Sequence, residues 1–294
     1  VMQHIEEAGI HSGDSACVLP PYKITSSALE QINIITKQLA LKLGVIGLIN
    51  IQFAYKDGEV YTLEVNPRAS RTIPFVSKAT NIPLARIAAQ ISVGATLDQF
   101  ELQPWEDNRY VTVKEAVLPF NKFPNESIFL SPEMKSTGEV MGISKNLGEA
   151  FRKACIGAGN ALPRSGNVFI SVNDTDKLDI ISIARDFVEL GFKLIGTENT
   201  ANVLNKNGLS TQYVFKVGEG RPSIVDEIKN KKINLVINTP MGSRSRYDEE
   251  AIGRACIRHG ILAVTTLSGA NAVLRAIRYP TNSTKVRSLQ EYHS

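Results

Sequence analysis

The chain has 294 residues, 43% of them hydrophobic and 21% charged, which is enough to bury one large core or two ordinary ones, and we expect two domains. The formal net charge is +4, and Lys and Arg form no tract that would follow a phosphate backbone, so nucleic acid is not an expected partner. No apolar run approaches the roughly 20 residues that span a bilayer, and the first residues lack a signal-peptide pattern. We therefore expect a soluble, cytoplasmic protein without a membrane partner.

The three cysteines, Cys17, Cys155 and Cys256, are widely separated and show no CxxC spacing. Neither a zinc site nor a disulfide framework is expected, and we interpret them as reduced, buried thiols. The chain opens on Val1 without an initiator Met or a leader, which suggests a fragment of a longer polypeptide.

The first half of the chain is expected to combine helices with a β-hairpin. Apolar residues recur at helical spacing over 26–43, and Gly44 follows as a helix terminator. The runs 46–55 and 60–65 are rich in β-branched and aromatic residues, and Lys56-Asp57-Gly58-Glu59 between them is a strong hairpin signal.

Beyond the hairpin, a second helix is predicted over 83–93 and a strand near 110–117. Four prolines, from Pro104 to Pro132, interrupt this part of the chain, and we expect irregular structure after the strand. A third helix is predicted over 146–155.

The pattern changes near 157–163, and we place a domain boundary there, between 1–157 and 158–294. Short apolar segments then alternate with helical ones, which is typical of a doubly wound parallel sheet with right-handed crossovers and helices on both faces. The predicted strands are 167–172, 193–196, 213–217, 234–238 and 263–265. The predicted helices are 175–190, 200–207, 223–229, 249–259 and 269–277.

The strongest chemical signal is Glu64-Val65-Asn66-Pro67-Arg68-Ala69-Ser70-Arg71 at the end of a predicted strand. Residues two apart on a strand project to one side, so Glu64 and Asn66 offer a carboxylate and an amide oxygen together. Such hard oxygen ligands suit Mg²⁺. Arg68 and Arg71 would supply positive charge for a transferring phosphoryl group. From spacing alone, a surface salt-bridge cluster at a strand end explains these residues equally well.

Gln52, on the preceding strand, joins this group only if the hairpin register allows it. A two-residue loop would place Gln52 on the face opposite Glu64, whereas a three-residue loop at Asp57-Gly58 would place Gln52, Glu64 and Asn66 on one face. We predict the three-residue loop.

The segment Glu64-Val65-Asn66-Pro67-Arg68 with Arg71, preceded by Asn50-Ile51-Gln52-Phe53, resembles the metal-binding end of the ATP-grasp fold. Three further segments resemble the second ATP-grasp half of carbamoyl-phosphate synthase large chains; they are 11–17, 74–79 and 119–124. The resemblance implies an α/β and α+β chain: the C-terminal portion of an ATP-grasp domain followed by a small doubly wound domain.

By this resemblance, Gln52, Glu64 and Asn66 are ligands of Mg²⁺ or Mn²⁺, and Gln52 and Glu64 also lie close to the ATP phosphates. Four consecutive residues would line the adenosine; they are Gly9, Ile10, His11 and Ser12. Arg68 and Arg71 would hold carbamate and phosphate. The implied reaction is phosphorylation of carbamate by ATP to carbamoyl phosphate, for pyrimidine and arginine biosynthesis, with ammonia supplied by a glutaminase small chain.

The glycine-rich flap of an ATP-grasp site would precede Val1, and catalysis depends on both sides of the site. We therefore expect the isolated chain to have no synthase activity and a weak affinity for ATP.

Polar residues also gather where the strands of the second domain should end, an arrangement that suits a phosphate because helix N-termini present free amides there. The residues are Lys177, 196–200, Lys216 and 238–244. Scattered loop polarity is the alternative interpretation. The segment resembles the methylglyoxal-synthase-like effector domain of the same large chains, which implies an allosteric site for a nucleotide monophosphate. By this resemblance, the phosphate-binding positions are Lys177, Thr197, Thr200, Lys216 and Asn238.

Two departures from the family pattern qualify this resemblance. Pro240 stands where bacterial relatives often have a threonine, although Thr239, Ser243 and Arg244 could compensate for the lost hydroxyl. The loop 239–249 has no His, so we expect no methylglyoxal synthase activity, because proton abstraction would lack its acid-base partner.

A third group resembles the site that binds the activator ornithine in some bacterial enzymes; it comprises Glu6, Asp14, Glu115 and Thr265. Its carboxylates would pair with the ammonium groups. Ala263 replaces an aromatic hydroxyl at that site, and ordinary surface carboxylates remain the alternative.

Two other functions fit parts of the sequence. A different ATP-grasp ligase, such as a biotin-dependent carboxylase, shares the strand-end Glu and Asn, but it differs after them and has no such effector domain. A non-catalytic phosphate- or nucleotide-sensing module would describe the fragment alone. The sequence does not identify the effector. It also does not determine the oligomeric state, and a homo-oligomer is compatible with it.

Overall fold

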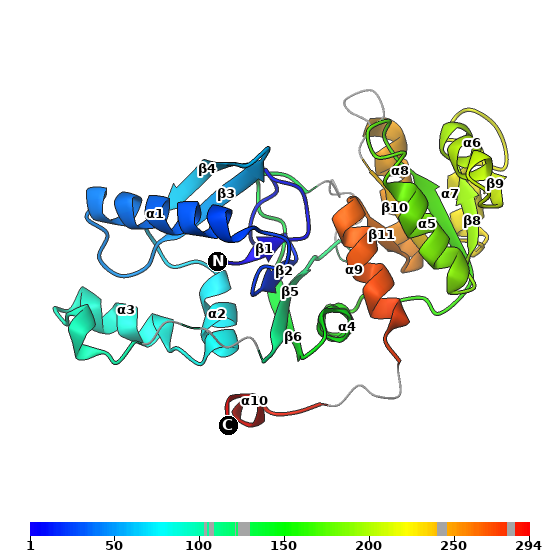
Figure 1. Cartoon of the computed structure of the whole chain (residues 1–294). Helices are drawn as coiled ribbons and strands as arrows, with labels where there is room; N and C mark the ends of the chain where they lie inside the picture. Colours follow the sequence, from blue (N-terminus) through cyan, green and yellow to red (C-terminus); the bar gives the residue numbers. More distant parts are fainter. Residues whose placement is uncertain (103–104, 106–108, 121, 123–129, 240–245, 281–285) are drawn as a thin grey trace.

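The computed structural model describes residues 1–294 except 103–104, 106–108, 121, 123–129, 240–245 and 281–285. The N-terminal part contains a four-stranded antiparallel sheet in the order β1-β2-β5-β6 (Figure 1). Its strands are β1 (Gln3–His4), β2 (Cys17–Leu19), β5 (Val111–Val117) and β6 (Gly138–Ser144). The predicted strand near 110–117 is confirmed as β5. The described residues between β5 and β6 are irregular, as expected, but the sequence did not predict β6, all of which pairs with β5.

A separate hairpin, β3 (Asn50–Lys56) with β4 (Glu59–Asn66), is covered by the long helix α1 (Ser26–Lys42). The helix predicted over 26–43 is thereby confirmed, and Thr25 caps it by accepting a hydrogen bond from the backbone N–H of Ala28 at 3.2 Å. Three further short elements follow: α2 (Thr72–Thr80), α3 (Leu84–Ser92) and the 3₁₀ turn η1 (Leu97–Gln99). Of these, the sequence predicted only α3.

Helix α4 (Leu147–Gly157) packs across β5 and β6. Asn146 caps it through hydrogen bonds from the N–H groups of Gly148 and Glu149, which confirms the predicted helix start. Close contact with the sheet requires a residue without a side chain on β6: a Cβ on Gly142 would lie 2.0 Å from the carbonyl oxygen of Ala150. The other face of α4 contacts α9 (Leu267–Arg278) of the C-terminal part.

The C-terminal part is a five-stranded parallel sheet in the order β11-β10-β7-β8-β9. Its strands are β7 (Asn167–Ser171), β8 (Lys193–Gly196), β9 (Thr211–Tyr213), β10 (Leu235–Asn238) and β11 (Leu262–Val264). Its remaining helices are α5 (Ile180–Glu189), α6 (Glu198–Lys206), α7 (Ile224–Lys229) and α8 (Arg246–His259). The doubly wound prediction is confirmed.

Two predicted elements of the parallel domain differ most in extent from the observed ones. Strand β9 ends at Tyr213 instead of reaching residue 217. Helix α5 begins at Ile180 rather than near 175, because the side-chain oxygen of Asn173 accepts hydrogen bonds from Thr175 and Asp176 and forms a turn there.

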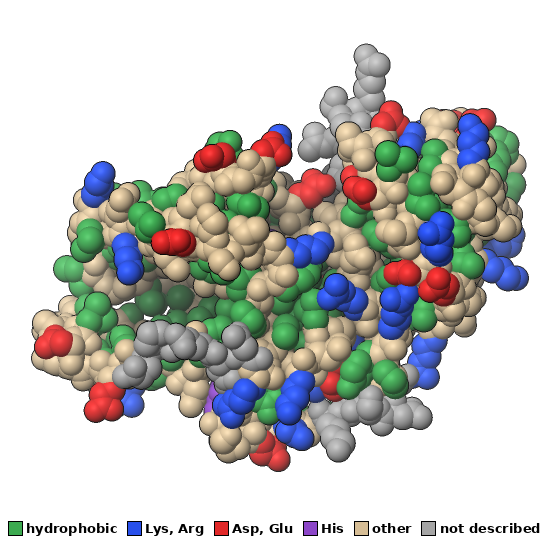
Figure 2. All heavy atoms as spheres, in the orientation of Figure 1, with side chains coloured by type: hydrophobic (Ala, Val, Ile, Leu, Met, Phe, Trp, Pro, Cys, Tyr) green, Lys and Arg blue, Asp and Glu red, His purple; other side chains and the backbone are tan. Residues whose placement is uncertain are grey.

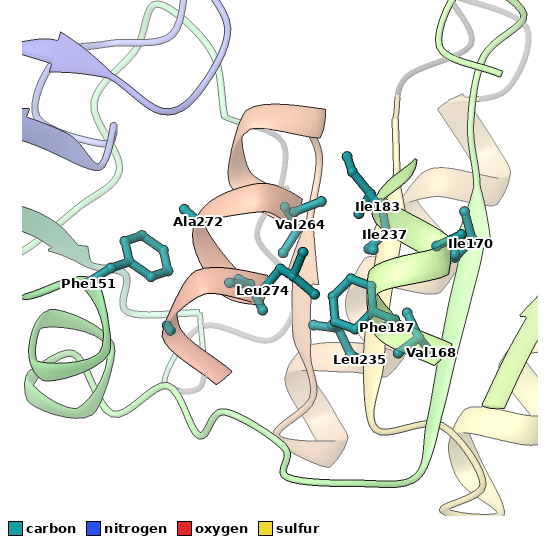
Figure 3. Close-up of a cluster of buried hydrophobic side chains, with 14 of the residues drawn as sticks. Phe151, Val168, Ile170, Ile183, Phe187, Leu235, Ile237, Val264, Ala272 and Leu274 are labelled. Carbon is teal, nitrogen blue, oxygen red and sulfur yellow. The ribbon is translucent and has the colours of Figure 1, made fainter. Parts of the chain in front are cut away.

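Successive residues of the central strands point to opposite faces of the parallel sheet, and each face has its own core. Phe169 and Val236 pack with α7 and α8, whereas Val168 and Leu235 pack with α5 and α9. The second core is continuous with the N-terminal part: in Figure 3, Phe151 of α4 lies on the far side of α9 from the sheet. The two parts are therefore joined by apolar packing, and the boundary at 157/158 stays a prediction.

The last residues return to the N-terminal part as α10 (Leu289–His293), which lies near α2, α4 and β6 (Figure 1). The buried Tyr292 donates a hydrogen bond to the carbonyl of Ile143 at 3.2 Å and accepts one from Lys153 at 3.2 Å. The ring of His293 lies 2.7 Å from the carbonyl oxygen of Lys78. The chain end is thus held by specific contacts.

Lys and Arg side chains on the face in Figure 2 are dispersed among acidic and neutral ones. That face carries no continuous basic stripe in the part of the chain that the structure describes. Within the same ranges, no helix is long and apolar enough to cross a membrane.

Replacing Gly142 with Ala should destabilise the protein by about 3 kcal/mol, because the new methyl group would collide with the α4 backbone and force that helix off the sheet. Urea unfolding followed by circular dichroism measures this change. Gly138→Ala on the same strand is the matched control, since a Cβ there would meet only Val117 at 3.9 Å. Equal stabilities of the two variants would contradict the close-approach explanation.

Candidate functional site

The β3–β4 hairpin turns through a two-residue loop, because Lys56 pairs directly with Glu59. Asp57 and Gly58 both have positive φ, 52° and 86°, which is the backbone conformation that a tight Asp-Gly hairpin turn requires. The prediction of a three-residue loop is therefore wrong. Asp-Gly favours the shorter turn because Gly adopts positive φ without steric cost.

A β-bulge nevertheless brings Gln52 opposite Glu64. The register shifts between Gln52 and Phe53, since Gln52 pairs with Glu64 but Phe53 pairs with Thr62, which leaves Leu63 as the extra residue. Directly paired residues project to the same face. The expected common face for Gln52, Glu64 and Asn66 is thus confirmed, while their role as metal ligands stays a prediction.

Asn50 pairs with Asn66 and completes this face with a third amide. The sequence analysis missed it, although its spacing of two from Gln52 was the signal that could have found it. We call Asn50, Gln52, Glu64 and Asn66 the hairpin oxygen face. It offers one carboxylate and three amides, a donor set of hard oxygens that fits Mg²⁺ or Mn²⁺.

Glu64 is exposed and forms no ion pair with Arg68 or Arg71 among the described residues. The salt-bridge-cluster alternative therefore has no support there. The same ranges contain no group of three or more His, Cys, Asp and Glu side chains that could hold a metal ion.

The hairpin oxygen face is linked to the predicted adenosine segment. The Gln52 side-chain N–H donates a hydrogen bond to the carbonyl oxygen of Ile10 at 3.0 Å. His11 is held in turn, because its Nδ1 accepts a hydrogen bond from the N–H of Gly13 at 3.0 Å. Gly9 is exposed with φ 98°, and Ser12 offers its carbonyl to the buried ammonium group of Lys114 at 2.6 Å. Gly9–Ser12 and the hairpin thus form one region.

The two arginines have different environments. Arg71 immediately precedes α2, and its Nη1 donates to the backbone carbonyl of Ser136 at 2.8 Å and to the Ser136 hydroxyl at 3.0 Å. Arg68 is exposed, and among the described residues its guanidinium group donates only to the neighbouring carbonyl of Ala69, at 3.2 Å. Arg71 is therefore the pre-positioned cation, whereas Arg68 is free to reach a ligand.

The structure brings together two of the four residues predicted for ornithine. One carboxylate oxygen of Glu6 and one of Glu115 are buried and have no hydrogen-bond partner in the part of the chain that the structure describes. Burial, and secondly the charge of Glu115, raise the pKa of Glu6 to about 8; burial raises the pKa of Glu115 to about 7. Lys114 opposes both increases. Two buried acids with raised pKa values suit a ligand that carries ammonium groups.

The other two predicted ornithine residues are arranged differently. Both carboxylate oxygens of Asp14 accept backbone hydrogen bonds, from Lys135 at 2.7 Å and Ser136 at 2.8 Å, so Asp14 braces a loop. Thr265 is exposed, and it is the next residue, Thr266, that donates to the carbonyl of Ile5 at 3.2 Å.

The residues predicted for the phosphate site lie at the carboxyl ends of neighbouring strands. Thr197 follows β8 and its hydroxyl contacts Thr200 at 3.5 Å, in the first turn of α6. Asn238 ends β10 and pairs with Ser171 of β7, whose hydroxyl accepts from Thr197 at 3.3 Å. Ser171 was missed from sequence because it ends an apolar strand without a neighbouring polar residue to mark it.

Two lysines border this group. Lys177 forms an ion pair with Asp174, and that hydrogen bond, with a smaller contribution from Lys216, lowers the pKa of the Asp174 carboxyl. The first amides of α6 add partial positive charge. Thr239 is engaged, since its hydroxyl accepts from the N–H of Asn173 at 3.0 Å. Pro240, Ser243 and Arg244 lie outside the described residues.

We predict that the free energy of unfolding falls as the pH rises from about 5 to about 8, because Glu6 and Glu115 bind protons more tightly in the folded than in the unfolded state. The stabilising contribution of the two acids is fully present below their pKa values in the unfolded state. It is lost as the pH rises through their pKa values in the folded state. Glu6→Gln should therefore be more stable than the unmodified chain at pH 9 and similar to it at pH 4.

Urea unfolding at several pH values tests this. Glu30→Gln, at an exposed position of α1, is the control. A stability difference for Glu6→Gln that does not change with pH would rule out the titration of this acid as the cause.

Two family models match the chain. Residues 2–100 match the model described as carbamoyl-phosphate synthase L chain, ATP binding domain, and residues 179–265 match the model described as MGS-like domain. A solved crystal structure of methylglyoxal synthase from Elizabethkingia anophelis NUHP1 covers 45% of this chain and 92% of its own, with 16% identity and a TM-score of 0.34. With so low a TM-score, the assignment of the C-terminal domain depends on the family model.

Curated relatives match the whole chain. The carbamoyl phosphate synthase large chains of Archaeoglobus fulgidus and Nostoc sp. are 51% and 50% identical to it over 295 and 298 residues, which cover 100% and 99% of this chain. The chain spans 27% of the length of each of these relatives. It therefore belongs to the carbamoyl phosphate synthase large chain family and joins part of that family's ATP-grasp ligase domain to an MGS-like domain.

Proposed function

We propose that this chain carries the metal-binding edge of an ATP site in which carbamate attacks the γ-phosphate of ATP to give carbamoyl phosphate and ADP. The observation that carries the proposal is the hairpin oxygen face, with Gln52 paired to Glu64 and hydrogen-bonded to Ile10. This contact supports the proposal because it joins the candidate metal ligands to the candidate nucleotide segment, and phosphoryl transfer from ATP needs metal and nucleotide side by side.

The chain's own residues divide the work of binding and charge stabilisation. Gln52, Glu64 and Asn66 would hold Mg²⁺ or Mn²⁺, which neutralises charge on the ATP phosphates when bound. The backbone of Gly9–Ser12 lies along the adenosine. Arg71, held by Ser136, orients and neutralises the oxygens of the transferring group, and the exposed Arg68 steadies carbamate.

The complete enzyme would take ammonia from a glutaminase small chain, act in the cytoplasm and supply pyrimidine and arginine biosynthesis. These proposals follow from the full-length relatives, of which this chain spans about a quarter. The isolated 294 residues should form no carbamoyl phosphate, because positioning by the rest of the site is needed for the transfer.

Glu64→Gln in a full-length large chain containing these residues should lower the rate of ATP formation from ADP and carbamoyl phosphate by about 100-fold, because the hairpin oxygen face loses its one carboxylate. The Mg²⁺ concentration giving half the maximal rate should rise as well. Glu59→Gln, exposed at the loop end of the same strand, is the control and should leave both quantities unchanged. Equal effects of the two substitutions would exclude a metal role for Glu64.

We also propose that the parallel-sheet domain binds the phosphate of a nucleotide monophosphate at the carboxyl ends of β8 and β10. The support is that the predicted residues occupy neighbouring strand ends beside the N-terminus of α6: Thr200 contacts Thr197, and Asn238 pairs with Ser171. Lys177 and Lys216 supply positive charge, and both lower the pKa of the Asp174 carboxyl. Ornithine is proposed for the buried pair Glu6 and Glu115, whose unpartnered oxygens would accept from its ammonium groups.

Lys177→Ala should weaken the binding of uridine or inosine monophosphate to the chain about tenfold, because one charge-assisted hydrogen bond to phosphate is lost. Calorimetric titration measures the affinity. Lys193→Ala provides the control, since Lys193 is exposed at the opposite, amino end of β8. Unchanged affinity in Lys177→Ala would move the phosphate site elsewhere.

A further inference from the structure

We propose that Ser136 is a positioning residue that fixes the guanidinium group of Arg71 relative to the nucleotide segment. This inference rests on the proposed function and adds a residue to it. Ser136 directly precedes the segment that enters β6, and it is 5% exposed. A buried serine hydroxyl needs defined partners. One partner of Ser136 is the predicted site residue Arg71, and the other, Gly13, directly follows the predicted nucleotide segment Gly9–Ser12.

The Ser136 hydroxyl lies between a cation and a carbonyl. It donates to the backbone oxygen of Gly13 at 2.9 Å and accepts from Arg71 Nη1 at 3.0 Å. The same Nη1 also donates to the Ser136 carbonyl at 2.8 Å. Because a hydroxyl has one proton to donate, its bond to Gly13 leaves the oxygen lone pairs directed to Arg71.

Ser136 is itself held in place. Its backbone N–H donates to Asp14 at 2.8 Å, and the neighbouring N–H of Lys135 donates to the other Asp14 oxygen at 2.7 Å. The N–H of His11 donates to the carbonyl of Ser131 at 2.9 Å. The segment 131–136 is therefore fastened to residues 11–14 by several bonds. Arg71 acquires a fixed orientation by bonding to an already rigid group.

This arrangement explains how a long side chain is ordered before any ligand binds. The described residues offer Arg71 no carboxylate, and the side-chain bonds that it makes to them all come from Nη1. Toward this part of the chain, the rest of the guanidinium therefore remains available to an anion. Pre-organised donors contribute most where charge develops in a transition state. Ser136 should therefore affect the transfer step more than the binding of ADP.

The test uses a full-length large chain containing these residues, assayed for ATP formation from ADP and carbamoyl phosphate. Ser136→Ala should lower kcat about tenfold or more, because a hydrogen bond to a charged group is lost. The KM for ADP should change less than about threefold. Ser136→Thr keeps the hydroxyl and should recover most of the rate.

Two comparisons separate positioning from general destabilisation. Ser144→Ala, at the end of β6, removes an equally buried hydroxyl that bonds to Glu149 on α4; it should lose stability without losing kcat. In an Arg71→Ala background, Ser136→Ala should lower kcat by less than about twofold further, because it acts through Arg71. Unchanged kcat in Ser136→Ala, or additive losses with Arg71→Ala, would overturn the inference. An unmodified enzyme that forms no ATP would instead overturn the proposed function, and this inference with it.

Discussion

The pairing of Gln52 with Glu64 is the contact on which the candidate ATP site depends. A two-residue turn by itself would send these side chains to opposite faces, since a shift of one residue reverses every side chain of a strand. The bulge at Leu63 adds one residue and reverses the effect. The two-residue turn together with the bulge therefore places Gln52 and Glu64 on one face, as a three-residue loop would have done. The tight Asp-Gly turn is kept.

Buried charged residues of β5 and β6 lie next to this site. Lys114 is fully buried, and its ammonium group joins the carbonyl of Ser12 to the carboxylate of Glu139. The same lysine opposes the increase in the pKa of Glu115, the next residue of β5. A buried lysine with partners on both sides fixes the candidate nucleotide segment Gly9–Ser12 relative to β5 and β6.

Periodicity predicted most of the fold. Helices α1, α3, α4 and the alternating second half follow from local patterns, because each buries a regular apolar stripe or a short β-branched run. Helix α2 was missed because Pro74 within its first turn resembles a breaker, although proline is tolerated there. Strand β6 contains two glycines, and its pairing with β5 is a long-range property that no local signal reveals.

The residue types of the candidate site could be predicted from the sequence, but the hydrogen bonds that hold those residues could not. Glu64, Asn66 and Gln52 follow from residue type and strand spacing. Ser136 lies 65 residues from Arg71 in the sequence, and a serine in a loop carries no local sign of what it will contact. Asp14 illustrates the converse: a carboxylate expected to bind a ligand instead accepts two backbone hydrogen bonds.

The return of α10 to the N-terminal part has a mechanical consequence. The parallel-sheet domain already contacts the N-terminal part through the packing of α9 on α4. The anchored Tyr292 and His293 add a second attachment at the end of the chain. If the α4–α9 packing opened, the parallel-sheet domain would therefore still be tethered at both of its ends, by the connection that follows α4 and by Tyr292.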